Sequence, residues 1–294
     1  MKVEQVYPER MGVGEGIGWA AEQGWLHWVD ITGRRLYRGA GDQVTAWDMP
    51  TEVGFCAPHV SGGVIVGLND GFALFDPSDG GFTPWGNPEP HMPGNRFNDA
   101  AVDRQGRLWA GTMPLGGAAE DPEGTLYRLD GPGVFERVME GFWTQNGMAF
   151  SPDGTLGYVS DSVPHVRRIW RFSVDPETGA PGERELFFDT AGLPGRPDGA
   201  TVDSEGCYWM AGVGGWQILR ITPEGIVDRQ IDVPVCRPTK LAFGGSGLVT
   251  LYVSTMGPGL SPDVRPEEQP LAGCVLALRP GVSGVPDMVV GGHD

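Results

Sequence analysis

The chain has 294 residues, with 38 Asp plus Glu against 21 Lys plus Arg, so its formal net charge is −17. Such an acidic chain offers no basic surface for phosphate groups, which makes nucleic acid a poor partner. The sequence shows no run of about 18 apolar residues, no signal-peptide stretch and no CxxC pair, so we expect a cytoplasmic protein with reduced cysteines and no membrane partner.

One unit recurs along the chain: a strand-like run, a turn at a glycine, and a second run rich in aromatic and β-branched residues. The six copies span residues 17–31, 57–71, 100–113, 148–162, 200–213 and 241–256. Their turn glycines are Gly24, Gly63, Gly106, Gly154, Gly206 and Gly245. The sequences D-x-x-G and P-D-G at several of these turns are typical of hairpins in which glycine adopts a positive φ. The pattern therefore predicts six similar hairpin units.

A third short run, alternating apolar and polar residues, follows most copies and is typical of a strand with one buried face. These runs lie at 34–40, 71–77, 124–130, 167–175, 216–225 and 274–280. No window longer than about ten residues has helical periodicity. We therefore predict an all-β fold, in which residues 1–294 form one six-bladed β-propeller domain with four-stranded antiparallel blades around a central channel. The segment 3–8 is expected to add an outer strand to the last blade and close the ring.

Oxygen-bearing side chains occupy four of the six equivalent positions just before the expected inner strands. They are Glu15, Asn98, Asn146 and Asp198, each eight or nine residues before the turn glycine of its copy. In a propeller these positions face one axis, and a site of carboxylates and amides without His or Cys suits a hard divalent cation. The plainer interpretation is that each Asn or Asp only caps a strand or turn.

Four motifs precede these strands in order along the chain. They are MGVGEGIGW at 11–19, Arg96-Phe97-Asn98-Asp99, Gln145-Asn146-Gly147 and Pro197-Asp198-Gly199. Together with VDRQGRLWAGTM and LYRLD they resemble the regucalcin/gluconolactonase (senescence-marker-protein-like) family, and more closely its bacterial sugar-lactonase branch. The resemblance implies a six-bladed propeller with one divalent metal ion in its channel. The identity of the ion, whether Ca²⁺, Zn²⁺, Mn²⁺, Mg²⁺ or Fe²⁺, stays open.

The resemblance also assigns roles to individual residues. It implies that Glu15, Asn146 and Asp198 bind the metal, and that Arg96 and Asn98 hold the substrate. The implied reaction is the hydrolysis of aldono-1,4- or 1,5-lactones to aldonic acids in carbohydrate catabolism. A cation-bound Asp198 stays ionised at neutral pH, so this residue can serve both as a ligand and as the proton acceptor.

Further residues are candidates for the substrate pocket. Trp143, three residues before Asn146, is expected to form a wall for the sugar ring. Arg196 and Arg237 repeat the spacing between Arg96 and Asn98, and whether either contacts substrate stays open. Animal members of the family carry a substrate-contacting Glu shortly after a GTM motif, whereas here Glu120 lies further along, so its role stays open too.

Two other functions stay open at this point. A phosphotriesterase or another esterase could use the same polarising cation on the same propeller. A calcium-binding propeller without catalysis would bind the ion and turn nothing over. No G-x-S-x-G motif and no metal-ligand spacing of histidines occurs in the sequence. We therefore expect a metal-dependent lactonase that acts on a small sugar lactone as a monomer or weak homo-oligomer.

Overall fold

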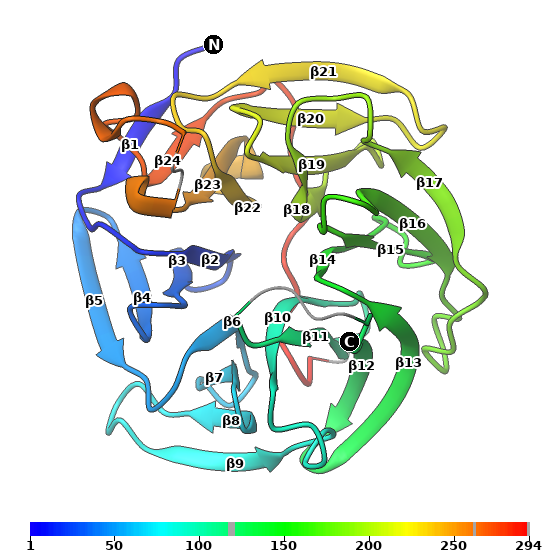
Figure 1. The fold of residues 1–294 in the computed structure, drawn as a ribbon. Helices are drawn as coiled ribbons and strands as arrows, with labels where there is room; N and C mark the ends of the chain where they lie inside the picture. The colour runs from blue at the N-terminus through cyan, green and yellow to red at the C-terminus, as the bar shows by residue number, and fades with distance from the viewer. Residues whose placement is uncertain (117–120, 261–262, 293–294) are drawn as a thin grey trace.

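The computed structural model describes residues 1–116, 121–260 and 263–292. Within these residues, 24 strands form six four-stranded antiparallel sheets, which are arranged around a central axis as the blades of a propeller (Figure 1). Three single-turn 3₁₀ helices, Ser246–Leu248, Pro258–Leu260 and Pro266–Glu268, accompany them. No helix in the described part is long and apolar enough to cross a membrane. The predicted six-bladed propeller is confirmed.

The strands of each blade follow one another in the chain from the channel outward. Blade 1 contains β2 (Gly14–Ala20), β3 (Trp25–Asp30), β4 (Arg35–Ala40) and β5 (Gln43–Asp48), and blade 2 contains β6 (Val53–Pro58), β7 (Val64–Leu68), β8 (Gly71–Phe75) and β9 (Phe82–Gly86). Blade 3 contains β10 (Asn95–Val102), β11 (Leu108–Pro114), β12 (Gly124–Gly131) and β13 (Val134–Phe142), and blade 4 contains β14 (Gln145–Phe150), β15 (Leu156–Asp161), β16 (Arg168–Ser173) and β17 (Glu185–Asp189). Blade 5 contains β18 (Arg196–Val202), β19 (Tyr208–Val213), β20 (Gln217–Ile221) and β21 (Val227–Asp232).

Blade 6 joins the two ends of the chain. It contains β22 (Pro238–Gly244), β23 (Thr250–Thr255), β24 (Val275–Leu278) and, as its outermost strand, β1 (Glu4–Tyr7). Strand β1 pairs antiparallel with β24, with Glu4 opposite Ala277 and Gln5 opposite Leu276. The prediction that the segment 3–8 closes the ring is therefore confirmed, and the closure hydrogen-bonds strands from both ends of the chain.

The hairpin turns follow the predicted chemistry with one shift. Gly106, Gly154 and Gly206 have φ values of 80°, 73° and 80°, which only glycine adopts without strain. In blade 2 the turn residue with positive φ is Gly62, at 88°, and not Gly63. The D-x-x-G and P-D-G motifs therefore mark turns between inner and second strands, and the second copy is offset by one residue.

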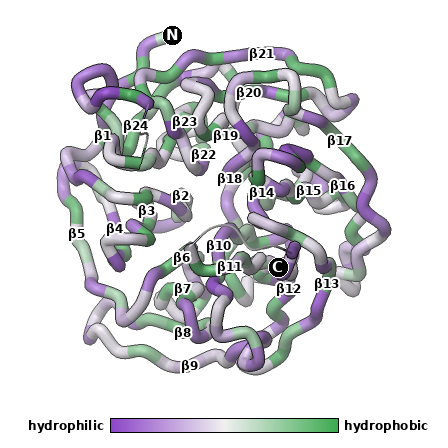
Figure 2. Tube along the Cα trace, in the orientation of Figure 1, coloured by the Kyte–Doolittle hydropathy of each residue, from purple (hydrophilic) through white to green (hydrophobic). Residues whose placement is uncertain are grey.

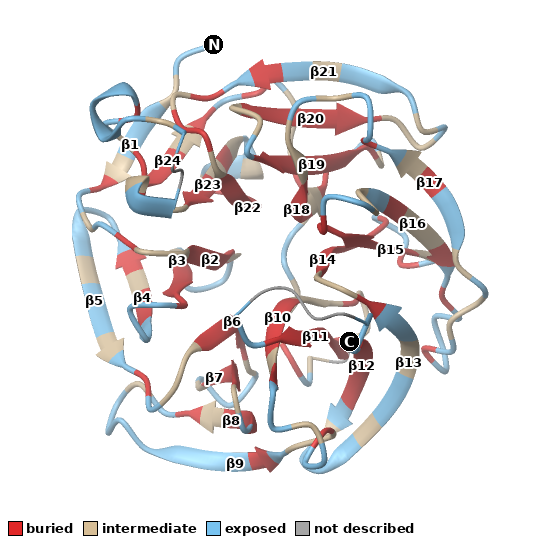
Figure 3. Ribbon diagram, viewed as in Figure 1, coloured by how far each residue is buried: buried red, intermediate tan, exposed pale blue. Residues whose placement is uncertain are grey.

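Apolar side chains fill the spaces between neighbouring blades. Six hydrophobic clusters occur among the described residues, one between each pair of adjacent blades around the ring. The inner strands are almost wholly buried, whereas the outermost strands β5, β9, β13, β17 and β21 are largely exposed (Figure 3). Along β17 and β21, hydrophilic and hydrophobic residues are mixed (Figure 2). The core therefore holds the inner strands in place around the channel.

The segment after β24 crosses one end of the channel (Figure 1). Its backbone bonds to three separate blades: Ser204 N donates to Ser283 O, Val290 N to Pro58 O, and Gly291 N to Gly106 O. Residues of this segment also line a small cavity of about 90 Å³, which we call the lower cavity. The segment therefore covers part of this end of the channel, and the inner strands begin at the other end.

Candidate active site

The inner strands carry irregularities at the positions that the repeat aligned. The pairing register shifts between Glu15 and Gly18 in β2, Phe97 and Ala100 in β10, Asn146 and Ala149 in β14, Pro197 and Ala200 in β18, and Pro238 and Leu241 in β22. A bulge changes the direction in which the side chains of a strand point. These shifts therefore allow residues at the start of each inner strand to face the channel instead of the space between blades.

Two glycines beside the site let the inner strands approach one another. Gly147 has a φ of 65°, and a Cβ there would lie 2.5 Å from the hydroxyl oxygens of Ser160 and Tyr208. A Cβ on Gly199 would lie 2.4 Å from Cδ of Lys240. The glycines after Asn and Asp in the sequence motifs are therefore required by packing at the channel.

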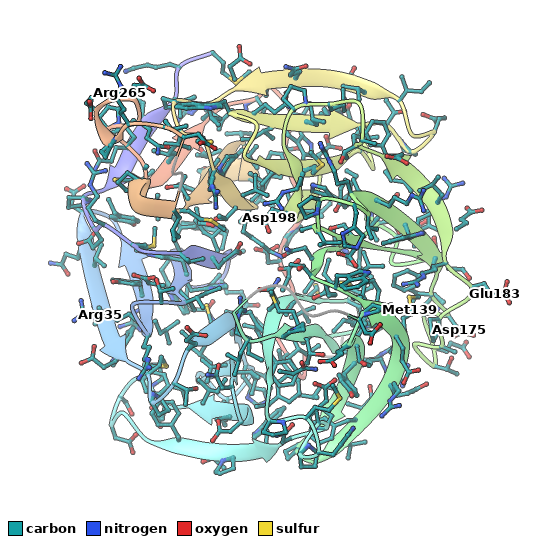
Figure 4. All side chains as sticks on the ribbon, viewed as in Figure 1. Arg35, Met139, Asp175, Glu183, Asp198 and Arg265 are labelled. Atoms are coloured by element: carbon teal, nitrogen blue, oxygen red, sulfur yellow. The ribbon has the colours of Figure 1, made fainter. Side chains whose placement is uncertain are left out.

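The predicted site residues meet in a cavity of about 400 Å³ where the inner strands begin, which we call the mouth cavity. Its polar lining includes Glu15, Arg96, Asn98, Asn146 and Asp198. They come from blades 1, 3, 4 and 5, and Asp198 lies near the centre of the ring while Asp175 and Glu183 lie at its periphery (Figure 4). Residues up to 183 positions apart in sequence thus share one small site.

Not all candidates lie on this cavity. Among the described residues, Thr144 lines it but Trp143 does not, and the Trp143 ring packs edge-on against His165 at 4.8 Å. Trp143 N donates to Asp161 Oδ2 at 2.7 Å, so the residue is held away by its own blade. Arg196 lines the cavity. Glu120 falls outside the described residues.

The two carboxylates of the site are buried, and the negative charge of Glu15 acts on Asp198. Glu15 and Asp198 are 7% and 4% exposed. Burial, together with the charge of Asp99, raises the pKa of Glu15 to about 8. Burial and the charges of Glu15 and Asp99 raise the pKa of Asp198 well above its usual range. The described residues donate no hydrogen bond to the Asp198 carboxylate, and the nearby cations Arg196 and Lys240 only partly offset this rise.

A divalent cation fits this donor set. It would offset the repulsion between Glu15 and Asp198 and keep both carboxylates ionised. Residues 1–116, 121–260 and 263–292 contain no group of three Asp, Glu, His or Cys side chains suited to a metal, and the amide of Asn146, which lines the same cavity, would supply a third oxygen donor. Two carboxylates and an amide are hard oxygen ligands, which leave coordination positions for water or substrate.

Hydrogen bonds hold the side-chain amide of Asn146 in place. Asn146 Nδ2 donates to Ser162 Oγ at 2.8 Å, and Asn146 Oδ1 accepts from Asn98 Nδ2 at 3.1 Å. Asn98 Nδ2 also donates to Gln145 O at 2.7 Å. Ser162 in turn donates to Pro197 O, next to Asp198. The blades that supply Asn98, Asn146 and Asp198 are therefore joined by a continuous set of polar contacts.

Arg96 lies at the edge of the same network. Its Nη1 donates to Asn98 Oδ1 and to Phe97 O, both at 2.9 Å, and its Nε lies 3.8 Å from Glu52 Oε2. Nη2 forms no hydrogen bond with any described residue. The guanidinium is thus held in position by three partners and retains a donor for a ligand in the cavity.

Lys240 and Asp99 form a buried ion pair next to the site residues, which the sequence analysis did not identify. Lys240 Nζ contacts Asp99 Oδ1 and donates to Ala100 O at 3.1 Å, and Met148 N donates to Asp99 Oδ2 at 2.8 Å. Lys240 also helps to line the lower cavity, and Asp99 directly follows Asn98, which lines the mouth cavity. In the sequence, the ion pair is indicated only by Asp99, the polar residue that directly follows the predicted site residue Asn98.

His27 lines the lower cavity, and its titration depends on how deeply it is buried at this end of the channel. Its ring is 5% exposed, its Nδ1 lies 3.2 Å from Cys56 Sγ, and burial lowers its pKa to about 4. Between pH 6.5 and 4, His27 is therefore protonated in the unfolded chain but stays neutral in the folded chain. The contribution of His27 to stability falls as the pH drops toward 4.

We expect this effect to remove up to about 3 kcal/mol from the free energy of unfolding between pH 6.5 and 4. Urea unfolding across this range, for the wild type and for His27→Gln, measures it as a difference in slope. A steeper loss of stability in the wild type is expected. Parallel curves would show that His27 titrates normally in the folded protein.

The fold and the site together define a class of protein: a six-bladed propeller with buried carboxylates and amides at the mouth of its channel. Residues 13–257 match the family profile described as SMP-30/Gluconolactonase/LRE-like region. The chain therefore belongs to this family.

Relatives in this family resemble the chain over nearly its whole length. The 6-deoxy-6-sulfogluconolactonase of Pseudomonas putida is 36% identical over 283 residues, 95% of each chain. The pentonolactonase of Haloferax volcanii is 35% identical over 87% of this chain and 86% of its own. The crystal structure of a calcium-binding regucalcin from Agrobacterium tumefaciens superposes with a TM-score of 0.89 at 29% identity, covering 97% of this chain and 96% of that one.

Proposed function

We propose that the protein hydrolyses aldono-1,4- or 1,5-lactones to aldonic acids in carbohydrate catabolism. The observation that carries the proposal is the meeting of the buried residues Glu15, Asn146 and Asp198 in one cavity with Arg96 beside them. Two relatives, named 6-deoxy-6-sulfogluconolactonase and pentonolactonase, support the same class of substrate. All four cysteines are free and buried, which supports the cytoplasm as the place of action.

Glu15, Asn146 and Asp198 would hold one divalent cation, with Ca²⁺, Mg²⁺ and Mn²⁺ favoured by the oxygen donors and Zn²⁺ and Fe²⁺ also open. When bound, this ion supplies polarisation of the ester carbonyl and a lowered pKa for a coordinated water. Asp198 accepts the proton of the attacking water, and the ring C–O bond breaks as that proton passes to the leaving oxygen.

Arg96 and Asn98 act on the substrate from the side of blade 3. The free Nη2 donor of Arg96 stabilises the oxygen on which negative charge develops. Asn98 contacts the sugar at the cavity wall and at the same time holds Arg96 and Asn146 in place through its amide. Trp143 would contact only substrates that extend beyond the cavity, since its ring lies off the cavity.

An Arg96→Ala variant separates substrate stabilisation from metal binding. We expect kcat/KM for a lactone to fall by an amount equivalent to about 2–4 kcal/mol. Affinity for the cation should stay the same or rise slightly, because a nearby positive charge is removed. Steady-state kinetics at saturating metal and a metal titration measure the two effects. Loss of metal binding in this variant would contradict the assignment.

Turnover of several substrate classes tests the proposed function. Purified protein with Ca²⁺, Mg²⁺, Mn²⁺, Zn²⁺ or Fe²⁺ is assayed on glucono-, galactono-, arabinono- and xylonolactones and on an organophosphate triester. The proposal expects hydrolysis of at least one lactone with a kcat/KM far above that for the triester. Preference for the triester would indicate a phosphotriesterase, and metal binding without turnover of either class would indicate a non-catalytic propeller.

A further inference from the structure

Two arginines at the mouth of the channel lack acidic partners. Neither Arg196 nor Arg237 forms a salt bridge within the described part of the chain, although the protein has a net charge of −17. Other arginines with little exposure are paired: Arg220 bonds to Asp203, Glu205 and Asp228, and Arg128 contacts Asp130 and Glu136. Arg104, Arg167 and Arg184 are also half-buried without a salt bridge in the described residues, but none of these three lines the mouth cavity, whereas Arg196 does.

The inner strands place Arg196 on the mouth cavity and Arg237 beside one of its lining residues. Arg196 begins β18 and lines the mouth cavity two residues before Asp198. Arg237 directly precedes β22, its carbonyl accepts from Met256 N at 3.0 Å, and its Nη1 lies 3.9 Å from the sulfur of Met256, which also lines the cavity. Arg196 on blade 5 thus lines the cavity, and Arg237 on blade 6 lies next to it behind Met256 without lining it, while Arg96 belongs to blade 3.

The surroundings of these arginines do not satisfy them. Both are half-buried, and Nε of Arg237 is buried without a hydrogen-bond partner in the structure. Partly buried cations with open donors are an arrangement that an anionic ligand stabilises, and guanidinium groups suit carboxylate, sulfonate and phosphate oxygens.

We propose that Arg196 and Arg237 form a subsite for an acidic group on the lactone substrate, remote from the ester that is hydrolysed. The proposal rests on the proposed lactonase function and names its substrate class: sugar lactones that carry a carboxylate, a sulfonate or a phosphate. The reacting ester lies by Asp198 and Arg96, and the acidic substituent extends toward blades 5 and 6. The remaining donors of Arg196 and Arg237 then pair with its oxygens.

The subsite is tested with glucono-1,5-lactone and analogues that carry a carboxylate, a sulfonate or a phosphate at carbon 6. The measured quantity is the ratio of kcat/KM for each acidic lactone to kcat/KM for the neutral lactone. We expect the wild type to prefer at least one acidic lactone, and Arg237→Gln and Arg196→Gln each to reduce that ratio about 10- to 100-fold. The preferred analogue identifies the acid. Arg168→Gln, which removes an exposed cation on β16, is the matched control and should leave the ratio unchanged.

Several results would overturn the subsite. One is a wild-type kcat/KM for the acidic lactones that is about equal to that for the neutral lactone. Another is an equal loss of kcat/KM for neutral and acidic lactones in the variants, which would mean that the arginines contact the sugar ring or the newly formed carboxylate. If neither kind of lactone is turned over, the lactonase proposal fails, and the subsite is then judged by calorimetric binding of glucarate against gluconate. Tighter binding of the doubly acidic glucarate that disappears in Arg237→Gln supports the subsite, and equal binding overturns it.

Discussion

An Asp198→Asn variant is expected to lose lactone hydrolysis by about 10²- to 10⁴-fold, the range for removal of a general base. Asparagine keeps the shape of the side chain but removes the negative charge that holds the cation and accepts the proton. The residue is 4% exposed, and its carboxylate accepts no hydrogen bond within the described ranges. It therefore contributes little to the stability of the fold. Activity should therefore fall far more than stability.

Steady-state kinetics at saturating metal and chemical unfolding check this result together. Asp189→Asn is the matched control, because Asp189 lies on the outer strand β17 with its side chain 40% exposed. It should leave both quantities unchanged. If Asp198→Asn kept more than about a tenth of the wild-type kcat/KM, Asp198 could not be the general base.

An Asp203→Ala variant is expected to lower the free energy of unfolding by about 3–5 kcal/mol, the cost of removing one member of a buried ion pair. Asp203 is fully buried in the turn between β18 and β19. One carboxylate oxygen accepts from the backbone N–H groups of Glu205 and Cys207, and the other from Trp209 Nε1 and Arg220 Nε, both at 2.8 Å. Alanine would leave these four donors without that partner.

The control for this variant is the equivalent turn of blade 4. Asp153 there is exposed and bonds only to neighbouring Ser151 and Thr155, so Asp153→Ala should cost less than about 1 kcal/mol. Urea unfolding of both variants in the same metal-saturated buffer gives the comparison. Similar losses for the two variants would contradict a special role for the buried Asp203.

Repetition explains why so much of the fold could be predicted from the sequence. Each unit carries its own turn signal and strand pattern, so residues such as Gly106 and Gly206 mark equivalent places without any knowledge of tertiary contacts. The alignment of the copies then placed Glu15, Asn98, Asn146 and Asp198 on one axis, and the structure brings them into one cavity. Periodicity thus carried long-range information that a single strand does not contain.

Side-chain direction and pairing across the channel could not be obtained in this way. Trp143 stands three residues before Asn146, yet the hydrogen bond from its N–H to Asp161 and its packing on His165 hold its ring off the cavity. The pair of Lys240 with Asp99 joins residues 141 positions apart on blades 6 and 3. No local pattern connects these two, because the contact exists only when the ring has closed.

Metal dependence is the central claim, and titration of the metal-free protein tests it most directly. The protein is stripped with a chelator, and one divalent cation is added stepwise while lactone hydrolysis and heat of binding are both followed. We predict that hydrolysis is lost on stripping, returns in full at one cation per chain, and fails to return in Glu15→Gln at the same cation concentration. Unchanged hydrolysis after complete removal of the metal, or full recovery in Glu15→Gln, would contradict the account.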